Sequence, residues 1–287
     1  MYKIIVDSSC DLLSLAHLHT RAAFGRVPLR ILVGETEYVD QAGLDTRAMM
    51  DAVYAFKGKT GSACPGPEDY AREYRTADEC YVLTISGSLS GSYNSAVLAR
   101  DLVLAESPEK RIHVFNTLTT GPELILLTEE IARLADSGLA FEMVCREAER
   151  YLTRTGLLFQ LNSMDNLTKN GRVSKMAGMT ARLLGIHMIG IASETGTVHP
   201  LHKCRGQERT YRLVVQELLQ NGFAGGRIVI GHAFQQAGAE ALRGMILEHF
   251  PAADITILPL GGLCCYYAEE GGLLIGFEKA ARAHHGV

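Results

Sequence analysis

The stretch ECYVLTISGSLSGSYNSAVLARDLVL, residues 79–104, decides the fold class. It begins with a short apolar run typical of a buried strand, continues through a turn rich in serine and glycine, and ends with the apolar spacing of an amphipathic helix. Short apolar runs and longer helical patterns alternate in the same way through the first half of the chain. We therefore predict an α/β fold there, with a mainly parallel sheet and crossover helices.

The elements of this first half are predicted from periodicity. The predicted strands are residues 3–6, 26–32, 79–85 and 111–115. The predicted helices are residues 46–56, 67–74, 90–104, 123–135 and 141–154.

The pattern changes after about residue 155, which predicts a second domain of α+β type. The strand-like HMIGIAS, the turn ETG and the segment TVHPLHK indicate a hairpin around Thr195 and Gly196. Further on we predict helices at 208–220 and 236–249 and strands at 227–231, 255–260 and 272–277. The chain has 287 residues, 47% of them hydrophobic, which is enough for two packed domains at 1–155 and 156–287.

Charge and composition exclude several classes of partner. Acidic residues number 32 and basic residues 28, with no long basic run to bind a phosphate backbone, so we expect no nucleic acid partner. No apolar stretch approaches the roughly 18 residues of a membrane helix, and the start MYKIIVDSSCDLL is unlike a secretory signal. Seven scattered cysteines without a pairing framework indicate free thiols and a cytoplasmic protein.

The turn within residues 84–96 is a candidate anion site. Ser90 and Ser92 stand at the start of the predicted helix, where backbone N–H groups and hydroxyls suit a carboxylate or a phosphate. The alternative is simple N-capping by one serine. The segment is not a hydrolase elbow, because GSLSG has Leu89 where the nucleophile is required.

Two other segments carry candidate donors. Ser62 lies in the loop GSACPGPEDY, whose prolines fix its shape, although an ordinary surface loop has the same composition. Tyr266 and Tyr267 are predicted to lie at the end of a strand in the glycine-rich segment 258–277 and offer phenolic donors, with aromatic core packing as the alternative.

The sequence predicts neither a metal site nor a nucleotide cofactor. His199, His202 and Cys204 lie close together, but a strand would turn His199 to the opposite face and no fourth ligand is apparent. A glycine-rich phosphate loop is also missing from the sequence.

Taken together, these segments resemble the DegV family of fatty-acid-binding proteins. The resemblance begins at VDSSCDL (6–12), similar to the family's TDSTADLP, and runs to the final strand. Val27 to Leu29 match an IPL strand. The further matches are SACPGPEDY with TSQPSPxDF, SGSLSGSYNSA with SSxLSGTYQSA, LTKNGRVS with LKKGGRIS, and KCRG at 203–206 with KVRG.

The resemblance implies a two-domain protein that is not an enzyme but a carrier, with a long-chain fatty acid in an apolar tunnel between the domains. Its carboxylate would be held by Ser62 and Ser90, with the Gly91 amide nearby, and presented to a separate fatty acid kinase. Arg205 occupies the place of an arginine that helps the kinase to dock.

One segment departs from the family's pattern. The family's GTHTGPGALG is CYYAEEGGLL here, so Tyr267 replaces a histidine and Glu269 and Glu270 replace Gly-Pro. A tyrosine donates one hydrogen bond without becoming cationic, so charge assistance to the carboxylate is lost. The two glutamates would disfavour an anion if they faced the tunnel mouth, and are otherwise solvated.

We therefore expect Ser62, Ser90, Ser92 and Tyr267 around the head group, with Arg172 as a structural or cleft residue. Two other functions compete with this one. The first is a small-molecule hydrolase or transferase that uses a cleft serine, and the second is a divergent interaction module that has lost lipid binding.

Overall fold

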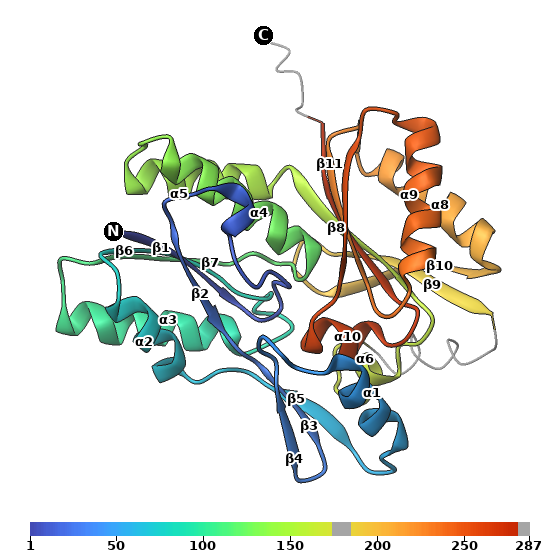
Figure 1. Cartoon of the computed structure of the whole chain (residues 1–287), viewed down its shortest axis with the longest axis horizontal. Coiled ribbons are helices and arrows are strands. Elements are labelled where there is room, and N and C mark those ends of the chain that lie inside the picture. The colour runs from blue at the N-terminus through green and yellow to red at the C-terminus, as the bar shows by residue number, and fades with distance from the viewer. Residues whose placement is uncertain (174–184, 281–287) are drawn as a thin grey trace.

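The computed structural model describes residues 1–173 and 185–280, in which the strands form three sheets that helices cover (Figure 1). The strands are β1 (Tyr2–Asp7), β2 (Ala23–Val27), β3 (Arg30–Val33), β4 (Thr36–Val39), β5 (Thr60–Ala63), β6 (Glu79–Leu83), β7 (Arg111–Phe115), β8 (Thr155–Leu161), β9 (Ile186–Ala192), β10 (Val198–Arg205), β11 (Arg227–His232), β12 (Asp254–Pro259) and β13 (Leu273–Glu278). The helices are η1 (Ala16–Leu18), α1 (Thr46–Ala55), α2 (Pro67–Arg75), α3 (Ser92–Glu106), α4 (Pro122–Asp136), α5 (Phe141–Leu152), α6 (Asp165–Lys169), α8 (Gln207–Gln220), α9 (Gln236–His249) and α10 (Gly262–Ala268).

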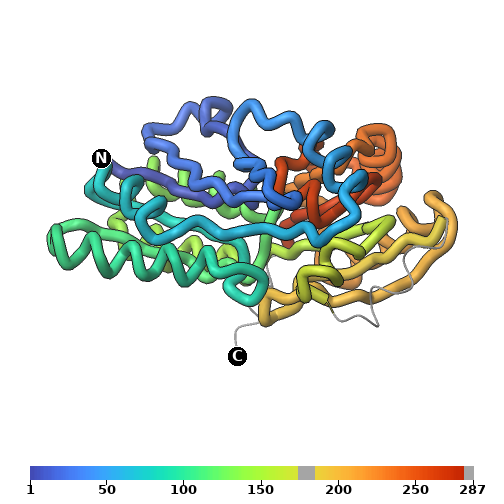
Figure 2. Tube along the Cα trace, turned by 90° about the horizontal axis from the view of Figure 1, so that it is seen from below, coloured from blue at the N-terminus to red at the C-terminus, as the bar shows by residue number. Residues whose placement is uncertain are grey.

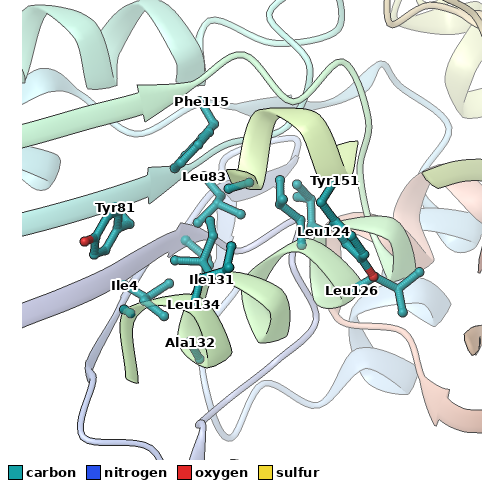
Figure 3. Packing of buried hydrophobic residues seen from close by; sticks show 14 of the residues in the cluster. Ile4, Tyr81, Leu83, Phe115, Leu124, Leu126, Ile131, Ala132, Leu134 and Tyr151 are labelled. Carbon is teal, nitrogen blue, oxygen red and sulfur yellow. The ribbon is translucent and has the colours of Figure 1, made fainter. Parts of the chain in front are cut away.

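The first sheet is parallel, in the strand order β2-β1-β6-β7. Because side chains alternate along a strand, Ile4 of β1 packs toward α4 and α5 while Ile5 packs toward α2 and α3 on the other face. Figure 3 shows Ile4, Tyr81 and Leu83 gathered against α4. The predicted parallel α/β arrangement with crossover helices is confirmed.

The second sheet has the order β10-β9-β8-β13-β11-β12 and is antiparallel except for the β11–β12 pair. Helices α8 and α9 pack on one face of it (Figure 1), and α4 contacts β13 and β11. The hairpin predicted around Thr195 and Gly196 is the β9–β10 pair. This mixed sheet confirms the predicted α+β character of the second half.

A glycine lets the two sheets approach one another. A Cβ atom at Gly276 in β13 would lie 2.5 Å from the backbone nitrogen of Glu123, which is far too close, so the first turn of α4 rests directly on β13 only because this residue has no side chain. The loop before α4 also lies beside the second sheet, because a Cβ at Gly196 in the β9–β10 hairpin would lie 2.8 Å from the Cα of Leu118.

One strand prediction is wrong. Residues 26–32 do not form a single strand: β2 ends at Val27 in the parallel sheet, and β3 begins at Arg30 in a separate antiparallel sheet with the order β4-β3-β5. Pro28 lies between them and has no N–H group to continue a ladder. The backbone N–H of Leu29 instead donates to the Ser8 hydroxyl at 2.9 Å, so the chain turns away from the first sheet here.

The placement of Tyr266 and Tyr267 at the end of a strand is also wrong, because both lie in the short helix α10. The Asp40 carboxylate accepts hydrogen bonds from the backbone N–H groups of Gly262 and Leu263, both at 2.9 Å. A carboxylate that satisfies the first N–H groups of a helix favours helix over strand, and this one comes from more than 200 residues earlier.

The tube in Figure 2 shows the first and last thirds of the chain side by side in the region of α1 and α10, which also contact one another. The division into domains at 1–155 and 156–287 stays a prediction; its last residues, 281–287, and Ser174 of the LTKNGRVS motif lie outside the described residues. Within the described ranges, no helix is long and apolar enough to cross a membrane.

Candidate functional site

An apolar cavity lies where the three sheets meet, with an empty volume of about 810 Å³ that includes its mouth. Its walls come from both halves of the chain and consist of Leu29, Ser62, Ile85, Leu89, Ser90, Leu118, Thr119, Thr120, Leu157, Phe159, Leu161, Leu167, Arg172, Ala192, Gly196, Thr197, Val198, Leu263, Cys264, Tyr267, Ala268 and Leu274.

Strand β8 supplies one apolar wall. Leu157, Phe159 and Leu161 line the cavity, whereas Leu158 packs in the core under α8 and α9. This follows from the two-residue period of a strand. Opposite Phe159, Gly190 of β9 has no side chain, and a Cβ there would lie 2.1 Å from the Phe159 ring. The Phe159 ring therefore occupies the space next to Gly190 that a side chain would fill.

Hydroxyl groups from distant segments meet at one place in the cavity wall. The Ser62 hydroxyl of β5 and the Tyr267 phenol of α10 form a hydrogen bond of 2.7 Å, and both residues line the cavity. Both are half-buried. The arrangement offers two polar groups, each able to donate a hydrogen bond to an acid group in a largely apolar space.

Ser90 also lines the cavity, just before α3 begins at Ser92. The two serine hydroxyls lie 3.2 Å apart, but Ser92 is fully buried and lies outside the cavity lining. Behind it lies the buried Asp7. Its carboxylate accepts hydrogen bonds from the Ser9 hydroxyl at 2.5 Å and from the Ile85 N–H at 2.9 Å.

Burial raises the pKa of Asp7 to about 6, because desolvation disfavours the carboxylate more than the hydrogen bonds from Ser9, Ile85 and Ser92 favour it. Asp7 thus ties the end of β6 to the start of α3. This bond network fixes the turn that carries Ser90.

Arg172 lies at the edge of the cavity. Its Nε donates to the Leu89 carbonyl at 3.1 Å, and its Nη1 donates to the Asn170 carbonyl. Gly91 does not line the apolar cavity; it precedes α3 and lines a neighbouring polar hollow, to which Arg172 also contributes.

The remaining predicted residues lie elsewhere. Arg205 is exposed at the end of β10, outside the cavity lining. Glu269 is 5% exposed and accepts a hydrogen bond from the Asn166 N–H at 3.0 Å, and its burial raises its pKa. Glu270 is exposed and pairs with Arg47. Neither glutamate lines the cavity.

Several positioning residues could not be predicted from the sequence. The Tyr266 phenol bonds to the Thr60 hydroxyl at 2.8 Å and accepts from the Asn170 amide at 2.9 Å, while the Asn166 amide donates to the Tyr266 carbonyl at 2.8 Å. These bonds hold α10 against β5 and α6, and so fix the neighbouring Tyr267. No local pattern signals such contacts, because Thr60 and Tyr266 are 206 residues apart.

Of the candidate metal ligands His199, His202 and Cys204 in β10, His202 pairs with a carboxylate instead. His202 Nε2 lies 2.6 Å from a Glu217 carboxylate oxygen of α8. In the part of the chain that the structure describes, no group of three or more metal-ligating side chains is found.

The fold and this cavity define an α/β protein whose two halves line one buried apolar cavity. A family model described as "Uncharacterised protein, DegV family" matches residues 1–280. The chain belongs to the DegV family.

Known proteins resemble the chain over nearly its whole length. A DegV domain-containing protein of Streptococcus pneumoniae is 46% identical over 277 residues, which cover 96% of this chain and 99% of the relative. One solved structure that resembles the chain is the crystal structure of the Streptococcus pneumoniae Fatty Acid Kinase (Fak) B3 protein loaded with linoleic acid. Its sequence is 45% identical, the TM-score is 0.95, and the match covers 98% of this chain and 100% of the other. A DegV family protein from Eubacterium eligens loaded with heptadecanoic acid is 34% identical, with a TM-score of 0.94 and the same coverage.

Proposed function

We propose that this chain binds a long-chain fatty acid in the apolar cavity, with its carboxylate at Ser62, Ser90 and Tyr267. The observation that carries the proposal is the hydrogen-bonded pair of Ser62 and Tyr267 in the wall of a largely apolar cavity that Ser90 also lines. Two relatives of the same fold are described as loaded with fatty acids, which supports it.

The energetics favour such a ligand. Burial contributes about 0.8 kcal/mol per methylene, so a long alkyl chain supplies on the order of 10 kcal/mol before ordering costs. A buried acid group without partners would offset much of this gain. Converging hydroxyls remove that cost by hydrogen bonding to the head group.

The protein acts as a carrier that presents the carboxylate to a separate fatty acid kinase rather than as an enzyme, with Arg205 on the surface that the kinase contacts. The relative named as part of a fatty acid kinase supports this role. A hydrolase that uses a cleft serine would need a base near Ser90, yet among the described residues that line the cavity there is no histidine and no carboxylate.

We also place the protein in the cytoplasm. All seven cysteines are free, and six are buried. Free thiols persist in a reducing compartment, which supports this location.

The test is direct titration of a fatty acid into wild-type protein and into the double variant Ser62→Ala, Ser90→Ala. We expect the double variant to bind at least about ten-fold more weakly, because each lost hydrogen bond to an acid group contributes about 1 kcal/mol or more. The exposed Ser14→Ala is the matched control. Unchanged affinity of the double variant would refute the head-group assignment, and native mass spectrometry showing no co-purified lipid would argue for the interaction-module alternative.

A further inference from the structure

The carboxylate of Asp7 is fully buried at the end of β1, behind the serines that precede and begin α3. One of its oxygens accepts from the Ser9 hydroxyl at 2.5 Å and from the Ser9 N–H at 3.1 Å, and the other accepts from the Ile85 N–H at 2.9 Å. Within the part of the chain that the structure describes, no basic side chain pairs with Asp7. Hydrogen bonds alone therefore stabilise its charge.

Hydroxyl groups connect Asp7 with the cavity. The Ser92 hydroxyl hydrogen-bonds to the Asp7 carboxylate and lies 3.2 Å from the Ser90 hydroxyl, which belongs to a residue of the cavity lining. Ser92 is fully buried, so its hydroxyl has only protein groups as partners. The hydroxyl of the buried Tyr70 in α2 also faces Ser92 and adds a phenol rather than a charge. A continuous chain of protein groups thus runs from Asp7 through Ser92 to Ser90.

The charge of Asp7 sets the direction of this chain, because each serine hydroxyl has only one hydrogen to donate. An ionised Asp7 only accepts, so Ser92 donates to it, Ser90 donates to Ser92, and the Ser90 oxygen is left to the cavity as an acceptor. A protonated Asp7 donates to Ser92, Ser92 donates to Ser90, and the Ser90 hydrogen is available to a ligand. An ionised fatty acid accepts hydrogen bonds only, so it requires the second arrangement.

We propose that Asp7 is a positioning residue for the fatty acid head group, that it acts through Ser92 and Ser90, and that it takes up one proton when the ionised acid binds. This inference rests on the proposed function. The proton comes from water and ends on Asp7, while the ligand carboxylate stays ionised and accepts from Ser90.

Electrostatics favour the same transfer. Two carboxylates in one buried network repel one another, and the pair lowers its energy when one of them holds a proton. Asp7 is suited to hold it, since burial already raises the pKa of Asp7 to about 6 in the free protein. The bound acid keeps its charge because it has the hydroxyls of Ser62 and Tyr267 as further donors.

Proton uptake is measured by calorimetric titration of dilute heptadecanoic acid into the protein at about pH 7.5, in buffers of different ionisation enthalpy. An ordinary carboxylic acid has a pKa of about 4.3, so the ligand enters ionised. Wild-type protein should take up about one proton per acid bound. Its affinity should fall by about ten-fold per pH unit between about pH 6.5 and pH 8 and level off below about pH 6, where Asp7 already holds its proton.

Two variants separate Asp7 from the rest of the site. Asp7→Asn cannot titrate, so it should bind without proton uptake and with an affinity that does not change over that pH range. Ser92→Ala keeps Asp7 but interrupts the hydroxyl chain, so uptake should fall below about half a proton, and this variant serves as the test if Asp7→Asn does not fold. Ser95→Ala, in the next turn of α3 and outside the cavity lining, is the control and should match the wild type.

The outcomes distinguish this inference from the proposed function. If wild-type protein does not bind heptadecanoic acid, the proposed function itself fails. If it binds the acid without taking up a proton, or if Asp7→Asn takes up as much as the wild type, the proton does not go to Asp7 and the inference is overturned. Full uptake by Ser92→Ala would overturn it as well, because the coupling would not pass through the hydroxyl chain.

Discussion

The hydroxyl oxygen of Ser62 and the phenol oxygen of Tyr267 lie 2.7 Å apart, although 205 residues separate them in the sequence. Each of these oxygens can donate only one proton, so the pair holds one hydrogen in its mutual bond when the cavity is empty. A bound carboxylate would draw both donors toward itself. In the free protein one O–H group therefore donates to the other oxygen, whereas a bound acid can accept a hydrogen bond from both groups.

Replacing Tyr267 by Phe should weaken fatty acid binding about five-fold, because one hydrogen bond to the head group is lost and the Ser62 hydroxyl remains. Isothermal titration with heptadecanoic acid measures this change. Tyr54→Phe is the control, since Tyr54 lies outside the cavity lining. An affinity equal to that of the wild type would show that the phenol does not contact the ligand.

How much of this site the sequence predicts depends on how local its signals are. The turn at Ser90 follows from a strand, a Ser/Gly segment and a helix in direct succession, and the structure has all three there. The cap of α10 by Asp40 is different. Its two partners are 222 and 223 residues away, so the tyrosines after it gave no local indication that they lie in a helix.

The break between β2 and β3 shows the same limit. Residues 26–32 have a continuous strand-like pattern, and only the pairing partners reveal that β2 joins the first sheet while β3 joins β4 and β5. Periodicity reports which faces are buried but not against which sheet. The network of Tyr266 with Thr60 and Asn170 was missed for that reason as well, because polar side chains that meet across the fold have no spacing in the sequence.

Filling the cavity should abolish lipid binding without unfolding the protein. Ala192 at the end of β9 lines the cavity, and Ala192→Phe would place an aromatic ring in space that the alkyl chain needs. We expect no lipid in native mass spectra of the variant and a thermal midpoint close to that of delipidated wild-type protein. The exposed Ala252→Phe is the control. Lipid retained by the Ala192 variant would place the ligand elsewhere.

Glu269 combines backbone strain with a buried hydrogen bond. Its φ of 55° and ψ of 175° lie at the edge of a region that is essentially reserved for glycine, and its carboxylate accepts from the Asn166 N–H. Glu269→Ala keeps the strain and leaves that N–H unpaired, which should cost about 1–3 kcal/mol of unfolding free energy. Glu269→Gly relieves the strain, so urea denaturation should show it to be more stable than Glu269→Ala by about 1 kcal/mol. The opposite order would contradict this account.

The buried Asp7 should make stability depend on pH. Burial raises its pKa to about 6 from its ordinary 3.8, so the folded protein holds this proton in a range where the unfolded chain has lost it. The Asp7 contribution to the unfolding free energy is therefore fully present below about pH 4, falls as the pH rises through about 6, and levels above that. Between about pH 4 and pH 6, the titration of Asp7 changes the slope of the unfolding free energy against pH by up to about 1.4 kcal/mol per pH unit.

The variant Asp7→Asn isolates this contribution. We expect it to be less stable than the wild type at low pH, because an amide NH₂ group then meets the N–H or hydroxyl donors of Ser9 and Ile85, but it cannot titrate. The measurement is the unfolding free energy of both proteins between pH 4 and pH 7, with the exposed Asp51→Asn as control. Parallel slopes for wild type and Asp7→Asn would show that Asp7 has an ordinary pKa.

Arg205 should matter for the kinase and not for the lipid. It is exposed at the end of β10 and does not line the cavity, so Arg205→Ala should leave the fatty acid affinity within about two-fold of wild type. A charge at the rim of a protein interface acts mainly on the association rate and its salt dependence. Phosphorylation of the bound fatty acid by the partner kinase should therefore slow at low protein concentration and recover as the concentration rises, while Arg243→Ala on the exposed face of α9 has no effect. If Arg205→Ala also lost lipid, or slowed the reaction equally at saturating carrier, Arg205 would belong to the binding site or to the chemical step and not to the docking surface.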